Sequence, residues 1–155
     1  MSRSRSAVHG QFTLSRSLAF TPAQVYAAWS TPEGKARWFA GPNGWQQHER
    51  TMDFRLGGKE RVVGRHATGT VSSFDATYLD IVENQRIVYT YTMHLDDRKI
   101  SVSLATVEFK PEKGGTRMVI TEQGVFIDGY EDKGNREHGT AYLMEQVEAS
   151  LRKGN

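Results

Sequence analysis

The 155-residue sequence contains no cysteine, which excludes disulfides, thiolate zinc sites and cysteine nucleophiles. No apolar run approaches the roughly 20 residues that a membrane-crossing helix needs, so no membrane span is expected. Neither sign of charge dominates, because 20 Lys and Arg residues stand against 18 Asp and Glu residues, interspersed along the chain. A nucleic-acid partner is therefore not expected. These absences favour a soluble, cytoplasmic protein.

The first ten residues contain two arginines but no apolar stretch, so no secretory signal is expected. We expect residues 1–10 to form a flexible N-terminal tail. The remaining length corresponds to one domain of ordinary size, so we assign residues 11–153 to a single domain.

Apolar side chains recur at every second position in residues 11–20, the period of a half-buried strand. Two Thr-Pro pairs follow, at residues 21–22 and 31–32, and each is typical of a helix start with Thr as the N-cap. We expect two short helices here, the second carrying Trp38 and Phe39.

Six further segments alternate between apolar and polar side chains, at residues 49–56, 59–66, 69–82, 86–96, 99–110 and 115–125. Short turns separate them, which favours an antiparallel meander. The last segment changes to a helical period, with Leu143, Met144, Val147 and Leu151 on one arc. The pattern predicts an α+β domain, in which a curled seven-stranded sheet leaves a ligand-sized gap against one long C-terminal helix.

Several segments resemble, in order and spacing, one branch of the START-like (SRPBCC) superfamily, the branch related to the activator of the 90-kilodalton heat-shock protein ATPase. They are Val25 to Trp29 with Thr31-Pro32-Glu33 and Trp38-Phe39, Asp53 to Gly58 (DFRLGG), Arg86 to Tyr91 (RIVYTY), Gly115 to Glu122 (GTRMVITE) and Arg136 to Met144. The resemblance implies a helix-grip (Bet v-like) fold with a hydrophobic cavity between sheet and helix. This superfamily includes lipid carriers, hormone-binding proteins, polyketide cyclases and co-chaperones, so the fold does not choose among functions.

Candidate ligand-binding residues are those that the strand and helix periods direct toward this cavity, together with Trp29, Trp38 and Phe39, which could form its lid where the two short helices close the sheet. Tyr89, Tyr91 and Met93 share one face of their strand with Ile87 and could present hydroxyls and a thioether to a ligand. Ordinary core packing is the alternative for all of them. The full set is Trp29, Trp38, Phe39, Phe54, Tyr89, Tyr91, Met93, Met118, Glu122, Arg136, Thr140, Leu143 and Met144.

Glu122 shares a strand face with Met118 and Ile120, so its carboxylate is expected to point inward, where it needs a partner. Arg136 falls on the apolar arc at the start of the last helix. We expect the two to meet at one end of the cavity, as a structural ion pair or as a polar anchor for a ligand. Glu122 is also the one candidate catalytic residue.

The five histidines lack metal-ligand spacing, and there is no phosphate-binding loop or serine-hydrolase motif, so neither a metal nor a cofactor is expected. Asp53 and Arg55 are expected to form a solvated pair, with Met52, Phe54 and Leu56 pointing inward.

Three functions remain open. The first is the binding of a small hydrophobic or amphipathic molecule, such as a lipid, a polyketide or an aromatic metabolite. The second is a polyketide cyclase-like enzyme that uses the same cavity. The third is a co-chaperone or stress-response interaction module with a chaperone partner. We favour the first, without catalysis, and a homodimer through a strand edge or the short helices is also compatible.

Overall fold

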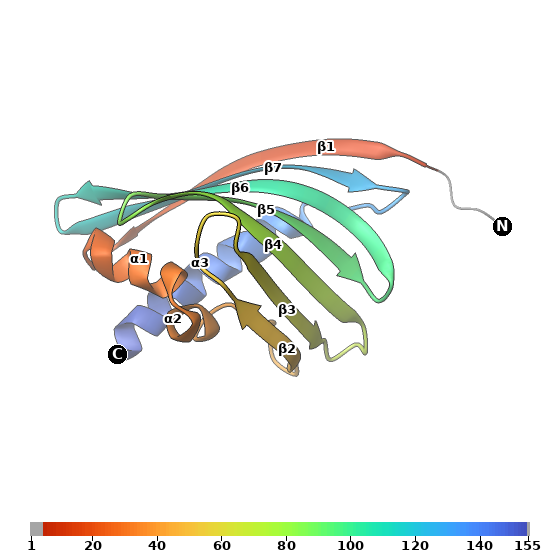
Figure 1. The fold of residues 1–155 in the computed structure, drawn as a ribbon, viewed down its shortest axis with the longest axis horizontal. Coiled ribbons are helices and arrows are strands. Elements are labelled where there is room, and N and C mark those ends of the chain that lie inside the picture. Colours follow the sequence, from red (N-terminus) through yellow and green to blue (C-terminus); the bar gives the residue numbers. More distant parts are fainter. Residues whose placement is uncertain (1–4, 155) are drawn as a thin grey trace.

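The structure, a computed structural model, describes residues 5–154 and contains one antiparallel sheet that curls around a long C-terminal helix (Figure 1). The strand order is β1-β7-β6-β5-β4-β3-β2, so all strands except the first follow the chain as a meander. This is the predicted helix-grip arrangement of seven strands and three helices. The strands are β1 (Ala7–Leu18), β2 (Gln46–Met52), β3 (Lys59–Arg65), β4 (Val71–Val82), β5 (Arg86–Leu95), β6 (Arg98–Glu112) and β7 (Gly115–Ile127), and the helices are α1 (Pro22–Ser30), α2 (Pro32–Ala36) and α3 (Asn135–Lys153).

The first strand begins at Ala7, and not at Gln11 as predicted. Residues 7–10 pair with the end of β7, starting at Ala7 opposite Ile127, so they do not belong to a tail. Backbone groups form this pairing whatever the polarity of the side chains, and the alternation in the sequence therefore could not reveal it. Residues 1–4 of the predicted tail lie outside the described residues.

The two Thr-Pro pairs start helices as predicted. Thr21 forms a capping box with Gln24 at the start of α1, and the Thr31 hydroxyl accepts from the backbone of Gly34 at the start of α2. Trp38 and Phe39 lie after α2 and not within it. The Trp38 indole donates to the carbonyl of Ala28 at 2.8 Å, which holds this segment against α1.

Strand β2 ends at Met52, four residues earlier than predicted, because the next residues form a loop that bonds to β4. Gly57 donates to the carbonyl of Tyr78 at 2.7 Å, and Tyr78 donates back to Gly58 at 3.0 Å. Leu56, expected to point inward, is 63% exposed in this loop.

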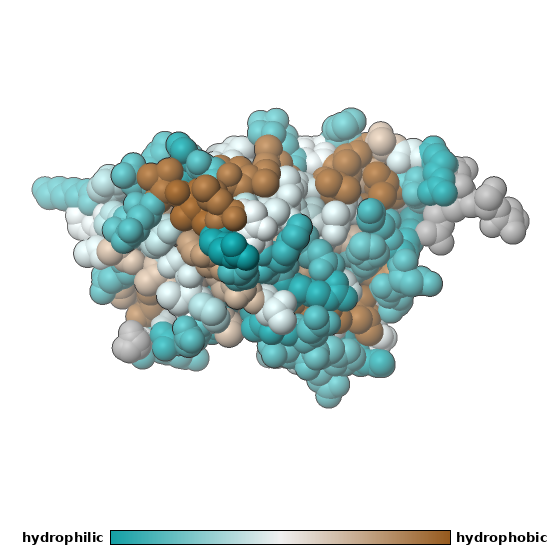
Figure 2. Space-filling view, in the orientation of Figure 1, coloured by the Kyte–Doolittle hydropathy of each residue, from teal (hydrophilic) through white to brown (hydrophobic). Residues whose placement is uncertain are grey.

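Helix α3 covers the concave face of the sheet and buries Met144 and Val147 against it. Helices α1 and α2 close one end of this space (Figure 1). On the face seen in Figure 2, apolar side chains form separate patches divided by polar ones. No helix within residues 5–154 combines the length and apolar character that crossing a bilayer requires.

Candidate ligand-binding cavity

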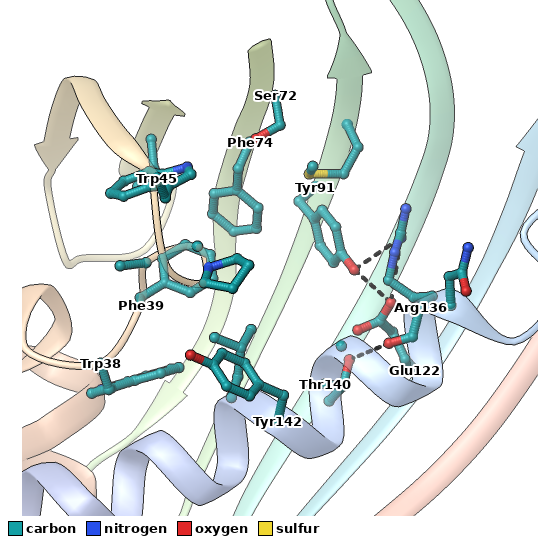
Figure 3. Close-up of a pocket in the computed structure, with 18 of the residues that line it drawn as sticks. Trp38, Phe39, Trp45, Ser72, Phe74, Tyr91, Glu122, Arg136, Thr140 and Tyr142 are labelled. Atoms are coloured by element: carbon teal, nitrogen blue, oxygen red, sulfur yellow. Dashed lines mark hydrogen bonds and ion pairs between the residues drawn. The ribbon is translucent and has the colours of Figure 1, made fainter. Parts of the chain in front are cut away.

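A cavity of about 420 Å³ lies between the concave face of the sheet and α3 (Figure 3). Trp38, Phe39 and Trp45 stand on one side of it, and Phe74 and Tyr91 face them from the sheet. Eleven of the predicted ligand-binding residues line it: Trp29, Trp38, Phe39, Tyr89, Tyr91, Met93, Glu122, Arg136, Thr140, Leu143 and Met144.

Phe54 and Met118 were also predicted to face a ligand, and neither lines the cavity. Phe54 follows the end of β2, and its ring packs between Tyr26 and Tyr78, with ring centroids 6.1 and 4.8 Å away. Met118 points inward as expected, but it is fully buried in the packed core. Strand alternation predicts on which face of the sheet a side chain lies. It does not predict whether that side chain contacts the packed core or lines the cavity.

One end of the cavity is polar and is built by Tyr91, Glu122 and Arg136 (Figure 3). The Tyr91 hydroxyl donates to Oε1 of Glu122 at 2.5 Å and accepts from Nη1 of Arg136 at 3.0 Å. The guanidinium and the carboxylate themselves are 3.7 Å apart. The structure thus brings Glu122 and Arg136 together at one end of the cavity, as predicted, with a tyrosine bridge that the sequence analysis did not anticipate.

Strand β6 supplies further partners for the guanidinium. Arg136 donates to the hydroxyls of Ser101 and Ser103, at 2.8 and 3.2 Å. Gly124 lies beside these serines on the neighbouring strand β7. A Cβ at this position would fall 2.8 Å from the Ser103 hydroxyl, so only glycine leaves room for it. A small residue here keeps the serine free to accept from Arg136.

Burial raises the pKa of Glu122 above its ordinary value, although the Tyr91 hydrogen bond and the charge of Arg136 oppose the shift. Burial, together with the charge of Glu122, also raises the pKa of Tyr91, which keeps its hydroxyl protonated as a donor. The hydrogen bond from Tyr91 and the ion pair with Arg136 both involve Oε1 of Glu122. In Figure 3 the other carboxylate oxygen points toward the open part of the cavity, where it can accept a hydrogen bond or a proton from a bound molecule.

The opposite end of the cavity contains a buried lysine that the sequence analysis missed. Lys35 of α2 is 2% exposed, and its Nζ lies 2.9 Å from Oε1 of Glu60 on β3. The Tyr78 hydroxyl donates to the same oxygen at 2.5 Å. Aromatic rings of Trp29, Trp38, Phe39 and Tyr89 surround the ammonium, with centroids 4.7 to 5.9 Å away.

A sequence signal for this pair existed only in part. Glu60 is two residues from Val62 in the same strand, so the two side chains lie on the same face of the sheet, the inner one. The sequence around Lys35 gives no sign that this lysine is buried. Its partner Glu60 is 25 residues away in the chain, and Glu33 in the same helix is exposed.

The outer wall of the cavity is Trp45, whose indole packs against two glycines. A Cβ on Gly41 would lie 2.3 Å from the ring, and a Cβ on Gly64 would lie 2.1 Å from it. Real Cβ atoms never approach that closely, so the indole rests directly on both glycine backbones. Trp45 itself lines the cavity.

One further sequence prediction concerns charged groups outside the cavity. Asp53 and Arg55 form an exposed ion pair at 2.7 Å, as expected. Within residues 5–154, no group of three or more His, Asp or Glu side chains is arranged to hold a metal ion.

Comparison with known proteins identifies one family. Residues 19–152 match the family described as Activator of Hsp90 ATPase homolog 1-like protein. No curated protein matches the sequence.

Solved structures of bacterial proteins are similar over nearly the whole chain. An uncharacterised protein from Rhizobium leguminosarum shares 46% identity with a TM-score of 0.92, covering 96% of this chain and 98% of its own. The Mll3558 protein from Rhizobium loti shares 37% identity with a TM-score of 0.86, covering 94% of this chain and 99% of its own. An AHSA1-like protein from Aeromonas hydrophila, at 17% identity and a TM-score of 0.70 over 93% of both chains, is similar in fold.

Proposed function

Because this chain belongs to the family of Activator of Hsp90 ATPase homolog 1-like proteins, within the START-like fold, we propose that it binds a small hydrophobic or amphipathic molecule in the cavity between sheet and α3. The observation that carries the proposal is the cavity itself. Its volume of about 420 Å³ lies within the range of roughly 300 to 1,000 Å³ typical of small-molecule sites. A packed core of this size has few voids larger than a water molecule.

The distribution of polar groups supports an amphipathic ligand. Most of the wall is aromatic or aliphatic, which favours an apolar body. Glu122, Arg136 and Tyr91 are concentrated at one end, where they can orient a polar group. A few polar groups among apolar walls are the usual composition of small-molecule sites.

A direct test is native mass spectrometry of the purified protein, followed by organic extraction and identification of any released compound. A stoichiometric compound supports binding and identifies its chemical class. If no compound is retained, titration with the neutral fluorescent probe N-phenyl-1-naphthylamine provides the second measurement. Absence of saturable binding there contradicts the proposal.

Gly139 of α3 offers a matched pair of variants for this titration. It lines the cavity, and a Cβ at this position would meet no atom within 4 Å. We expect Gly139→Ala to bind the probe as the wild type does, and Gly139→Phe to bind it at least about tenfold more weakly, because the ring occupies cavity space. Equal binding by both variants would place the probe elsewhere.

A second candidate function is catalysis in the same cavity, and one observation favours it. The carboxylate oxygen of Glu122 that points toward the open cavity can accept a proton, and the raised pKa of Glu122 brings it closer to neutral pH. A substrate would have to be found first, so ligand identification also tests this alternative.

A further inference from the structure

The hydroxyl group of Tyr89 has no structural role in the fold. Tyr89 lies on β5, is 8% exposed and lines the cavity. Its neighbours Tyr78 and Tyr91 each donate to a glutamate, whereas the Tyr89 hydroxyl makes no hydrogen bond to any side chain or backbone group within residues 5–154. The hydroxyl oxygen is not fully buried, so it opens onto the cavity, where a bound molecule can accept a hydrogen bond from it.

The ammonium group of Lys35 also has donors to spare. An ammonium carries three N–H donors, and within residues 5–154 the one hydrogen bond from Nζ goes to Glu60. The remaining surroundings are aromatic faces, including the ring of Tyr89, whose centroid is 5.9 Å from Nζ. Lys35 and Tyr89 therefore present unused donors in the same part of the cavity wall.

Charge balance indicates what these donors can bind. Glu60 neutralises Lys35, and Glu122 neutralises Arg136, so the two buried pairs together contribute no net charge. An anionic ligand would lose its hydrating water on entering the cavity and would find no unpaired positive charge to compensate for that loss. A neutral oxygen acceptor can bind both donors without that penalty.

The walls around these donors favour an aromatic molecule, because they are themselves largely aromatic. Phe39 and Phe74 face each other edge to face at 4.8 Å, and Trp45 is held in place by its two glycines. Aromatic side chains of this kind stack against aromatic ligands.

We propose that the Lys35–Tyr89 end of the cavity binds the carbonyl oxygen of a neutral aromatic ketone or aldehyde, with the ammonium and the hydroxyl as donors. The proposal rests on the proposed function, because it names the ligand class of the same cavity. It assigns ligand-binding roles to Lys35, which the sequence did not point to, and to the Tyr89 hydroxyl.

The test compares three probes of similar size: 2-acetylnaphthalene, which has a carbonyl, 2-ethylnaphthalene, which has none, and 2-naphthoate, which is an anion. We expect the wild type to bind the ketone about tenfold more tightly than the hydrocarbon, and the anion most weakly. Tyr89→Phe removes a hydroxyl that holds no part of the fold together, so it is expected to fold normally. Its preference for the ketone over the hydrocarbon is expected to fall to about threefold or less.

Tyr26→Phe is the matched control, because Tyr26 is as buried as Tyr89, at 8% exposed, but does not line the cavity. This variant is expected to keep the wild-type preference. The infrared C=O stretch of bound 2-acetylnaphthalene provides an independent signature. It is expected at lower frequency than in hydrocarbon solvent and to move back partway in Tyr89→Phe.

The outcomes separate this proposal from the one on which it rests. If the ketone and the hydrocarbon bind equally well, the carbonyl site is refuted while cavity binding stands. Tighter binding of 2-naphthoate, or an unchanged ketone preference in Tyr89→Phe, also refutes it. If none of the three probes binds and the protein carries no extractable compound, the proposed function fails as well.

Discussion

Glu122 and Arg136 lie 3.7 Å apart, and the stronger contacts between them pass through the Tyr91 hydroxyl, which donates to the carboxylate and accepts from the guanidinium. All three side chains line the cavity. The same network can therefore hold sheet and helix together and still present polar groups to a ligand, and the two roles can be separated by experiment.

Arg136→Leu tests the structural role. This change leaves the Glu122 carboxylate buried without its cation, so we expect a loss of about 3–5 kcal/mol in the free energy of unfolding, measured by urea titration. The double variant with Glu122→Leu is expected to be more stable than Arg136→Leu alone. The exposed Arg55–Asp53 pair is the control, since Arg55→Leu is expected to cost less than about 1 kcal/mol. If Arg136→Leu is stable but loses ligand, its role is in binding rather than in stability.

The raised pKa of Glu122 gives the stability of the protein a defined pH dependence. Between the ordinary value of 4.5 and its raised pKa, the folded protein holds a proton on Glu122 that the unfolded chain has released. The contribution of Glu122 to stability therefore falls as pH rises through this window and is constant above it. The measurement is the free energy of unfolding of the wild type minus that of Glu122→Gln across acidic to neutral pH. A difference that stays constant, or rises with pH, contradicts the assignment.

Lys35→Met tests the buried pair at the other end of the cavity. The substitution keeps the apolar stem but leaves Glu60 without its cation, so it is expected to cost about 3–5 kcal/mol in urea unfolding. Adding Glu60→Gln keeps an acceptor for the Tyr78 hydroxyl and removes the unpaired charge. The double variant should therefore recover part of the loss, and additive effects of the two substitutions would show that the groups are not coupled.

Gly64→Ala tests the position of Trp45. The added Cβ would fall 2.1 Å from the indole, which must move. We expect a loss of about 1–3 kcal/mol and a red shift of tryptophan emission as the ring becomes more exposed. Gly139→Ala is the matched control, because its Cβ meets nothing and alanine favours the helix by up to about 1 kcal/mol. Unchanged emission and stability in Gly64→Ala would mean that the indole does not rest on this glycine.

Much of the fold followed from local patterns. Strand alternation placed Tyr91 and Glu122 on the inner face, and the helical period placed Arg136 on the arc facing them. These patterns depend only on residues within one strand or helix. The predicted inward faces therefore remain correct even where the predicted ends are wrong by a few residues, as at the start of β1 and the end of β2. Phe54 was misplaced because its strand assignment was wrong at one of those ends.

The sequence by itself determined the fold class, the inward faces and the two Thr-capped helix starts, because side-chain period and capping chemistry are local properties of the chain. Only the tertiary structure decided that Lys35 is buried beside Glu60, that Trp45 rests on Gly41 and Gly64, and that the Tyr89 hydroxyl has no partner. Each of these depends on how far apart two segments lie once the sheet has curled. That spacing arises from the packing of the whole domain, and no local pattern of residues encodes it.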